Sequence, residues 1–290
     1  MLHPKNKKKK EIMKKANSLF FVEYPKKILY NEYGDTMLAL ITGASSGIGR
    51  DMARVLSEMG YDLILVARRK TKLQALKKEL NTNVECIVMD ISTTFNCMEL
   101  YQEVKDRDID IVINNAGFGL FGEFNDTNLD KELDMIDLNI KSVHTLTKLF
   151  LKDFKKKDKG YILNVASSAA FLPGPLMATY YATKAYVLRF TEAIHEELRK
   201  DKSHVYIGTL CPGPVNTEFN KVAKVSFSLN GLESREVAEY AIKKMFHKKM
   251  IIIPGITMKL SKFFIRFAPE QLLLKVAYRI QSKKRALNSK

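Results

Sequence analysis

The sequence has few cysteines and no arrangement of them that suggests a disulfide framework. Its 290 residues include three, Cys86, Cys97 and Cys211, which lie far apart and show no partner spacing. Such cysteines are expected to be buried thiols in a reducing compartment. The sequence therefore predicts a cytoplasmic protein with no disulfides and no metal site.

Signals for membrane insertion and export are also lacking. The stretch 160–183 carries no charge and is long enough to raise the question of a membrane-spanning helix. It contains Asn164, two prolines and two glycines, so no span is predicted. The first residues, "MLHPKNKKKKEIMKK", are basic but have neither the apolar core nor the cleavage site of a signal peptide, so export is not expected.

The chain is not poor in apolar residues, and its positive charge is unevenly placed. With 46% hydrophobic residues it can bury the core of one large domain. Much of the net charge of +16 lies at the two ends. We predict a basic extension (1–35), one domain (36–255) and a basic amphipathic helical tail (256–290). No aromatic stacking motif or reading helix accompanies the charge, so nucleic acid is not an expected partner.

The helical tail leaves two interpretations open. Its apolar residues alternate with Lys and Arg at helical spacing in "TMKLSKFFIRFAPEQLLLKVAYRIQSKKRALNSK". A pair of helices packing on the domain or on a sister subunit would explain this pattern. A helix lying on an anionic membrane surface would explain it too.

Short apolar runs alternate with helical segments along the domain. The runs are apolar almost throughout, as is typical of strands that are covered on both faces. They predict an α/β fold: a Rossmann-type, doubly wound sheet of about seven parallel strands with helices on both faces. A helix is expected over "IGRDMARVLSEMG", ending at Gly60. The seven runs are 37–42, 62–67, 84–89, 109–114, 161–166, 205–210 and 250–254.

A glycine-rich turn follows the first run, in "TGASSGIG". A strand, a glycine-rich turn and then a helix allow backbone N–H groups to approach a pyrophosphate and point the helix N-terminus at it. The turn therefore predicts a dinucleotide site. The cofactor-binding residues expected here are Gly43, Ser45, Ser46, Gly47, Ile48 and Gly49.

The end of the second run indicates which dinucleotide is bound. An acidic residue at this place would bind a ribose 2′-hydroxyl, whereas a basic one accepts a 2′-phosphate. The sequence reads "VARRK", with Ala67 where the carboxylate would stand and Arg68 and Arg69 after it. This favours NADP(H). Arg68 is the preferred phosphate ligand, and which of the two arginines dominates stays open.

Four motifs in order carry a family resemblance. They are "TGASSGIG", "NNAG" at 114–117, "YYATK" at 180–184 and "CPGPVNT" at 211–217. Together they resemble the short-chain dehydrogenase/reductase family, in its ordinary-length, NADP-preferring form, over roughly residues 36–255. The resemblance implies hydride transfer between a nicotinamide and a small-molecule carbonyl or alcohol, and a homodimer or homotetramer.

Three tyrosines compete for the acid–base role in "MATYYATKAY". A free tyrosine has a pKa near 10, so a nearby cation is needed to lower it. Lys184 follows Tyr180 by four residues and Tyr181 by three, on the same helix face, whereas Tyr186 points elsewhere. Spacing leaves Tyr180 and Tyr181 tied. The family pattern Tyr-x-x-x-Lys implies Tyr180.

The resemblance implies further site residues. The catalytic serine, thirteen positions before the tyrosine, falls on Ser167, with Ser168 as the neighbour in doubt. Asn139 matches the asparagine that holds a water in a proton relay with the lysine. The segment from Phe219 to Gly231 matches a lid over the substrate. The remaining implied cofactor contacts are Asp90 with Ile91 beside the adenine, Asn115 with Gly117 beside the ribose, Pro212, Val215 and Thr217 beside the nicotinamide and pyrophosphate, and Tyr180 and Lys184 themselves.

The residues expected around the substrate are mostly apolar. They are Phe171, Leu172, Met177, Phe219 and Phe227. Such a lining favours a lipophilic carbonyl over a sugar. An alternative function is a catalytically idle NADPH-binding sensor or scaffold, which consumption of NADPH with any carbonyl compound would exclude.

Overall fold

The structure is a computed structural model that describes residues 37–219, 223 and 231–288. The predicted basic extension and nearly all of the predicted lid, Phe227 included, lie outside the described residues. Within the described part, no helix is both long and apolar enough to cross a bilayer.

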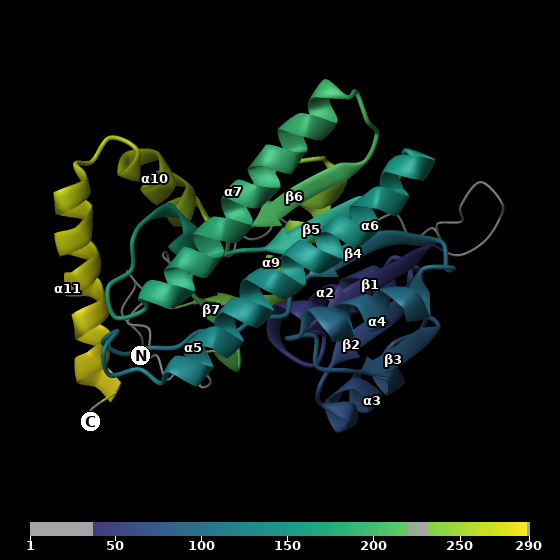
Figure 1. The fold of residues 1–290 in the computed structure, drawn as a ribbon, viewed down its shortest axis with the longest axis horizontal. Coiled ribbons are helices and arrows are strands. Elements are labelled where there is room, and N and C mark those ends of the chain that lie inside the picture. The colour runs from purple at the N-terminus through teal and green to yellow at the C-terminus, as the bar shows by residue number, and fades with distance from the viewer. Residues whose placement is uncertain (1–36, 220–222, 224–230, 289–290) are drawn as a thin grey trace, which may run out of the picture.

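Seven parallel strands form one sheet in the order β3-β2-β1-β4-β5-β6-β9, as the sequence predicted (Figure 1). From β1 the chain adds β2 and β3 on one side of β1. It then crosses back and adds β4, β5, β6 and β9 on the other side. The strand order therefore reverses between β1 and β4, where open α/β sheets form a crevice at the strand ends. The strands are β1 (Leu38–Thr42), β2 (Asp62–Ala67), β3 (Val84–Val88), β4 (Ile109–Asn114), β5 (Tyr161–Val165), β6 (Tyr206–Leu210) and β9 (Ile251–Ile252), and β7 (Val215–Asn216) pairs separately with β8 (Leu232–Glu233).

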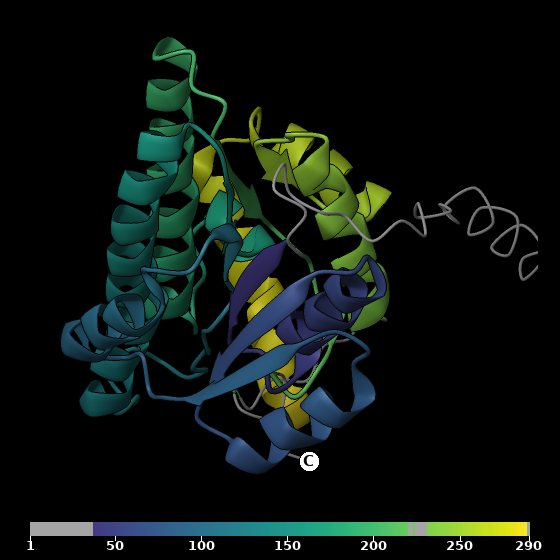
Figure 2. The same cartoon turned by 90° about the vertical axis from the view of Figure 1, so that its right-hand side faces the viewer.

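Helices cover both faces of the sheet, which lies between two helical layers (Figure 2). Alternate residues of a strand point to opposite faces. In β1, Ala39 and Ile41 belong to the apolar cluster under one layer, and Leu40 belongs to the cluster under the other. One layer holds α2 (Gly47–Glu58), α3 (Lys70–Glu79) and α9 (Ser234–Phe246), and the other holds α4 (Thr94–Val104), α6 (Val143–Lys157) and α7 (Ala178–Lys200).

The first helix begins and ends where the sequence indicates. Ser46 occupies the N-cap position of α2 in an extended conformation. Past the C-cap residue Met59, Gly60 has a φ of +91° and donates its N–H to the carbonyl of Ser57 at 2.9 Å. A glycine suits this left-handed position because it has no Cβ to clash.

The C-terminal helices α10 (Ile256–Ile265) and α11 (Glu270–Asn288) lie together at one end of the molecule (Figure 1). α11 lies beside the N-terminal end of α7, where Gln281 bonds Tyr181. Ala277 and Gln281 of α11 are buried, at 4% and 2% exposure. Three shorter elements complete the fold: α5 (Leu129–Ile136), a π-helical turn (Asp137–Ser142) and a 3-10 turn (Ser168–Phe171).

Candidate functional site

A cavity of about 1020 Å³ opens at the carboxyl ends of the central strands. Its wall includes the glycine-rich turn, Arg68 and Arg69 at one end. The wall continues past Ser167, Tyr180 and Lys184 to apolar side chains of α10 and α11 at the other end. Of the predicted cofactor-binding and catalytic positions, all but Gly49 and Asn139 line this cavity: Gly43, Ser45, Ser46, Gly47, Ile48, Arg68, Asp90, Ile91, Asn115, Gly117, Ser167, Tyr180, Lys184, Pro212, Val215 and Thr217.

The glycine-rich turn is held closely against β4. Gly43 has a φ of +66°, and a Cβ added there would lie 2.8 Å from the Cα of Ala116. Asn115 donates its side-chain amide to the carbonyls of Thr42, at 3.0 Å, and Gly43, at 3.3 Å. A Cβ at Gly49 would come within 2.3 Å of that amide nitrogen. Asn115 therefore fixes the shape of the turn, and the tight packing explains the glycines at 43 and 49.

Arg69 lies on the glycine-rich turn. Its guanidinium donates to the hydroxyl of Ser45, at 3.0 and 2.8 Å, and to that of Ser46, at 2.6 Å. Arg68 is 68% exposed at its side chain and forms a longer ion pair with Asp90, at 3.4 Å. Asp90 also accepts the backbone N–H of Ser92, at 3.1 Å. Of the two arginines, Arg69 thus has more contacts with the turn, although the sequence reasoning preferred Arg68.

A carboxylate that the sequence reasoning missed lies beside Arg69. Glu218 accepts hydrogen bonds from Arg69, at 2.7 Å, and from Lys72. These bonds lower the pKa of Glu218 to about 2. Glu218 follows the predicted Thr217, but no sequence signal indicates that it reaches across to α3.

Tyr180 and Ser167 meet at the middle of the cavity. Ser167 lies two residues after the end of β5, and its hydroxyl accepts the backbone N–H of Ala169, at 3.1 Å. A hydrogen bond between the side chains of Ser167 and Tyr180 lowers the pKa of Tyr180, but burial raises it more, to about 12. Ser168 also lines the cavity, and its backbone N–H donates to the carbonyl of Pro212, at 2.8 Å.

Lys184 lies behind the Tyr180 ring. Its Nζ is 5.9 Å from the ring centroid and donates to the carbonyl of Val165, at 3.0 Å. Burial lowers the pKa of Lys184 to about 8. The net pKa of Tyr180 therefore lies above that of a free tyrosine, and the expectation that Lys184 helps to lower it stays a prediction. Removing the phenol from water raises its pKa more than its neighbours lower it.

Asn139 is fully buried in the π-helical turn between α5 and α6. Its amide donates to the carbonyl of Phe118, at 2.9 Å, and to the hydroxyl of Thr183, at 3.1 Å. Its carbonyl oxygen accepts the N–H of Phe118, at 3.1 Å. A Cβ at Gly117 would lie 2.8 Å from that oxygen and 3.3 Å from Lys184 Nζ, so all three residues meet around one point.

The other two tyrosines of "MATYYATKAY" have different neighbours. Tyr181 faces α11, where its hydroxyl accepts a hydrogen bond from the Gln281 amide, at 2.5 Å. Tyr186 is 37% exposed and its hydroxyl lies 2.7 Å from Nδ1 of His144. The contact between Tyr181 and Gln281 spans 100 residues, and no sequence signal predicts it.

The segment after β6 faces the glycine-rich turn. A Cβ at Gly47 would lie 3.1 Å from the Cγ2 of Thr217. The hydroxyl of Thr217 accepts the N–H of Phe219, at 3.3 Å. The ring of Phe219 in turn lies 5.5 Å from that of Tyr180, between centroids. The structure thereby brings the predicted residues of this segment between the turn and Tyr180.

The far end of the cavity is apolar. Four of the five residues predicted around the substrate, Phe171, Leu172, Met177 and Phe219, line it. The C-terminal helices add Met258, Leu273 and Ala277 among others. That these helices contribute to the wall was not predicted, because their apolar pattern could not indicate what they pack against.

Comparison with known proteins agrees with this geometry. The model of the short chain dehydrogenase family matches residues 37–225. An uncharacterised oxidoreductase of Staphylococcus epidermidis is 30% identical over 224 residues, covering 77% of this chain and 96% of its own. The human very-long-chain 3-oxoacyl-CoA reductase is 33% identical over 196 residues, covering 64% of this chain and 62% of its own.

A solved structure supports the same assignment. A short-chain dehydrogenase from Sphingobium yanoikuyae, in complex with NADPH, superposes with a TM-score of 0.71 at 30% identity and covers 76% of this chain and 88% of its own. Fold, motif order and sequence similarity agree. This chain is a member of the short-chain dehydrogenase/reductase family of oxidoreductases.

Proposed function

We propose that this protein is an NADP(H)-dependent oxidoreductase that interconverts a lipophilic carbonyl compound and its alcohol, with Tyr180 as the acid or base. One observation carries the proposal. A single cavity joins the glycine-rich turn to the hydroxyls of Ser167 and Tyr180 and the amine of Lys184. A hydride donor, a proton donor and a group that polarises the carbonyl are what carbonyl reduction requires.

The residues present fit a dinucleotide. The glycine-rich turn lines the cavity, and α2 presents its N-terminus there, where free backbone N–H groups can bind a pyrophosphate. Bound NADP(H) would supply or accept the hydride. The residues that would hold it are Gly43, Ser45, Ser46, Gly47, Ile48, Gly49, Arg68, Arg69, Asp90, Asn115, Tyr180, Lys184, Pro212, Val215 and Thr217.

The preference for NADP(H) rests on charge at the end of β2. Ala67 offers no carboxylate to a ribose 2′-hydroxyl, and two guanidinium groups follow it. Guanidinium groups bind phosphate through paired charge-assisted hydrogen bonds. The Sphingobium relative, whose structure contains NADPH, supports the same choice.

The proton chemistry starts from a protonated Tyr180. With a pKa of about 12 the phenol keeps its proton at neutral pH, so Tyr180 is set to donate it to a carbonyl oxygen that gains negative charge. Ser167 would hydrogen-bond the same oxygen. A protonated Lys184 would stabilise the tyrosinate left behind, and in the oxidative direction that tyrosinate would act as the base.

Asn139 would act through the residues around it. Because its amide is bonded to Phe118 and Thr183, it holds the wall beside Lys184 in place. Its predicted share in a water-mediated proton relay stays a prediction.

The apolar end of the cavity supports a lipophilic substrate. Large apolar side chains from four separate segments surround it, and few polar groups face them. Such walls favour apolar ligands oriented by a small number of polar groups. The name of the human relative, a very-long-chain 3-oxoacyl-CoA reductase, points in the same direction.

The test is NADPH oxidation, followed by absorbance, across a panel of carbonyl compounds with Tyr180→Phe and Tyr181→Phe. Tyr180→Phe should lower turnover at least ~100-fold, the usual effect of removing a general acid, and leave NADPH binding within a few-fold. Tyr181→Phe, a change of the same size next to it, should keep most activity. A fully active Tyr180→Phe enzyme would contradict the assignment, and no turnover with any carbonyl would favour a sensor or scaffold.

A further inference from the structure

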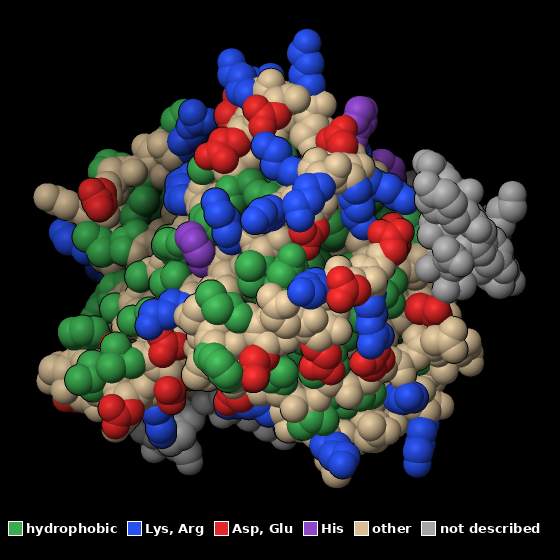
Figure 3. Space-filling model, turned by 45° about the vertical axis from the view of Figure 1, so that its right-hand side comes forward, with side chains coloured by type: hydrophobic (Ala, Val, Ile, Leu, Met, Phe, Trp, Pro, Cys, Tyr) green, Lys and Arg blue, Asp and Glu red, His purple; other side chains and the backbone are tan. Residues whose placement is uncertain are grey.

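The exposed apolar side chains of this protein are concentrated on its C-terminal helices. Ten of the 17 large hydrophobic residues exposed in the described structure lie between Ile256 and Ile280. Phe263, Phe264 and Phe267 form a cluster of rings, with centroids 5.6 and 5.2 Å apart, and are 59%, 65% and 69% exposed. Figure 3 shows hydrophobic side chains gathered on the left of the view, where these helices lie. A contiguous apolar surface of this kind marks an interaction site.

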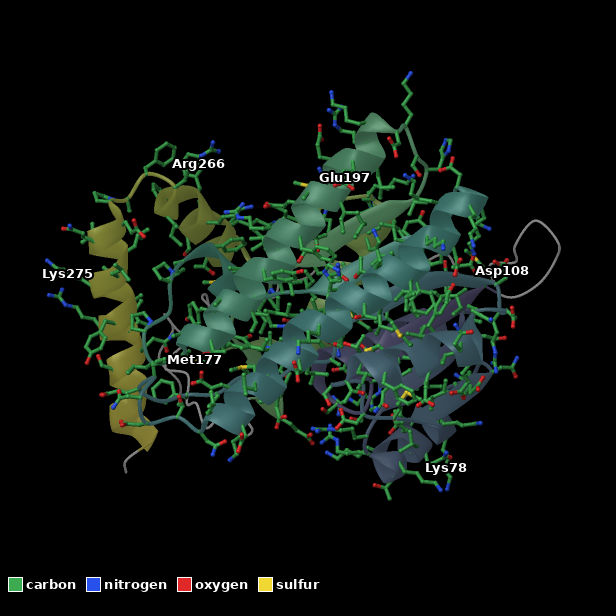
Figure 4. All side chains as sticks on the ribbon, in the orientation of Figure 1. Lys78, Asp108, Met177, Glu197, Arg266 and Lys275 are labelled. Atoms are coloured by element: carbon green, nitrogen blue, oxygen red, sulfur yellow. The ribbon has the colours of Figure 1, made fainter. Side chains whose placement is uncertain are left out.

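The same helices are basic. Between residues 256 and 282 there are five basic residues, Lys259, Lys262, Arg266, Lys275 and Arg279, and one acidic residue, Glu270, which gives a charge of five minus one, or +4. Lys275 projects from α11 away from the rest of the molecule, and Arg266 lies near the turn between α10 and α11 (Figure 4). Aromatic and aliphatic side chains beside Lys and Arg are typical of helices that lie at a membrane surface.

The cavity reaches this surface. Leu260, Phe264, Leu272, Val276 and Ile280 all line the cavity and are between 42% and 65% exposed. The apolar wall of the cavity therefore continues onto the outer surface of α10 and α11, with Ser261, Lys262 and Gln281 as polar members of the same lining. A lipophilic molecule could follow these side chains from the outer surface into the cavity.

We propose that the outer face of α10 and α11 docks on an anionic lipid bilayer, and that a lipophilic carbonyl substrate enters the cavity from the membrane through this face. The second part rests on the proposed function. Arg266, Lys275 and Arg279 would lie near anionic headgroups, whose attraction for Lys and Arg adds to apolar insertion, whereas Lys259 and Lys262 lie over the rings of Tyr240 and Phe171. A second copy of the chain fits this face less well, because a two-fold contact would bring like charges together.

Vesicle co-sedimentation of the full chain tests the docking. Wild-type protein should bind vesicles of phosphatidylcholine with phosphatidylserine at least tenfold more tightly than vesicles of phosphatidylcholine alone, and salt should weaken binding. The double variant Phe263→Ser/Phe267→Ser, neither of which lines the cavity, should lose at least tenfold. The control Phe95→Ser/Phe124→Ser removes side chains that are equally exposed, at 67% and 71%, but lie elsewhere, and should bind as wild type does.

Three results would overturn the docking proposal. They are no binding of wild-type protein to either vesicle, equal loss in the control variant, and conversion of a dimer to a monomer by Phe263→Ser/Phe267→Ser without any vesicle binding. The third result would show that the outer face of α10 and α11 binds a second copy of the chain.

Substrate entry has its own measurement. With a long-chain ketone carried in the vesicles, Phe263→Ser/Phe267→Ser should reduce turnover at least fivefold, while turnover of a short water-soluble ketone stays within twofold. If soluble ketones are reduced but vesicles are not bound, only the docking proposal fails. If vesicles are bound but no carbonyl is reduced, the proposed function fails and the docking stands.

Discussion

The two ends of the cavity are built in different ways. At the end near β1 and β2, polar side chains are fixed by one another: Asn115 holds the glycine-rich turn, and Arg69 bonds Ser45 and Ser46. At the other end, apolar side chains of α10 and α11 form the wall and part of the outer surface. Under the proposed function, the first end would hold the dinucleotide through backbone shape and charge, whereas the second would bind the substrate through apolar contact.

The largest effect should come from breaking the turn. In Gly43→Ala the new Cβ would meet backbone at 2.8 Å in a residue with φ +66°. The left-handed conformation alone costs about 1–3 kcal/mol, and the collision adds to it. Nucleotide binding, measured by fluorescence titration, should be lost and the melting temperature should fall.

Gly255→Ala is the matched control for that variant. Gly255 also has a positive φ, +81°, with a ψ of 139° that side chains likewise disfavour, but a Cβ there meets only Leu232 Cδ1, at 3.6 Å. It should show the cost of strain alone and retain nucleotide binding. Equal behaviour of the two variants would mean that close packing at Gly43 does not matter.

The two arginines should separate NADPH from NADH. Removing charge-assisted hydrogen bonds costs about 1.5–3 kcal/mol, so Arg69→Ala should weaken NADPH binding by ~10–100-fold and leave NADH binding nearly unchanged. Arg68→Ala should do less, because Arg69 is held on the glycine-rich turn by Ser45 and Ser46, whereas Arg68 is 68% exposed at its side chain. A larger loss from Arg68→Ala would restore the ranking that the sequence suggested.

Glu218→Gln tests the same phosphate site, but here the affinity for NADPH should rise. The carboxylate of Glu218 engages Arg69 and Lys72, the cations available to a phosphate. Because exposed ion pairs contribute about 0–1 kcal/mol, the variant should bind NADPH up to ~5-fold more tightly in equilibrium titrations. Weaker binding would show that Glu218 instead helps to position Arg69.

The pH dependence of reduction tests Tyr180 and Lys184, which lie between the two ends of the cavity. Lys184, with a pKa lowered to about 8, is charged below that pH and neutral above it, whereas Tyr180 keeps its proton up to about 12. Reductive kcat/KM should therefore fall as pH rises through about 8, because the positive charge that stabilises the tyrosinate is lost. In Lys184→Arg any remaining activity should lack this fall, since guanidinium stays charged. A rate that rises through this range would contradict the assignment.

The smallest effect concerns how α11 is held. Gln281→Leu and Tyr181→Phe each remove one side of a buried hydrogen bond, worth about 1 kcal/mol. The melting temperature of the double variant should be no lower than that of the worse single variant, since both remove the same contact. Strictly additive losses would show that the two side chains do not meet.

The features that could be predicted from the sequence are those set by residues that are close together in the chain. The strands were recognisable because both faces are buried, and the site of the turn because glycine is needed where backbone segments meet. Tyr180 and Lys184 share a helix face by spacing alone. Such features depend on residues close together in the chain.

Features that depend on distant segments were not predicted. The contact of Tyr181 with Gln281 joins α7 to a helix 100 residues away. The side of the turn that each arginine faces depends on where β2 ends and α3 begins. Burial, which raises the pKa of Tyr180 although Lys184 is near, depends on the whole fold.

The π-helical turn at Asp137–Ser142 determines how the chain tolerates deletion there. Each residue of an α-helix advances by about 100°, and the wider turn lets Asn139 reach Phe118 while Val143 and Leu146 still pack in the core. Removing the exposed Lys141 would turn this segment into a regular α-helix. Asn139 would then be rotated relative to Val143 and Leu146, and both sets of contacts could not be kept. Deleting this one surface residue would therefore displace either Asn139 in the cavity wall or the core residues of α6.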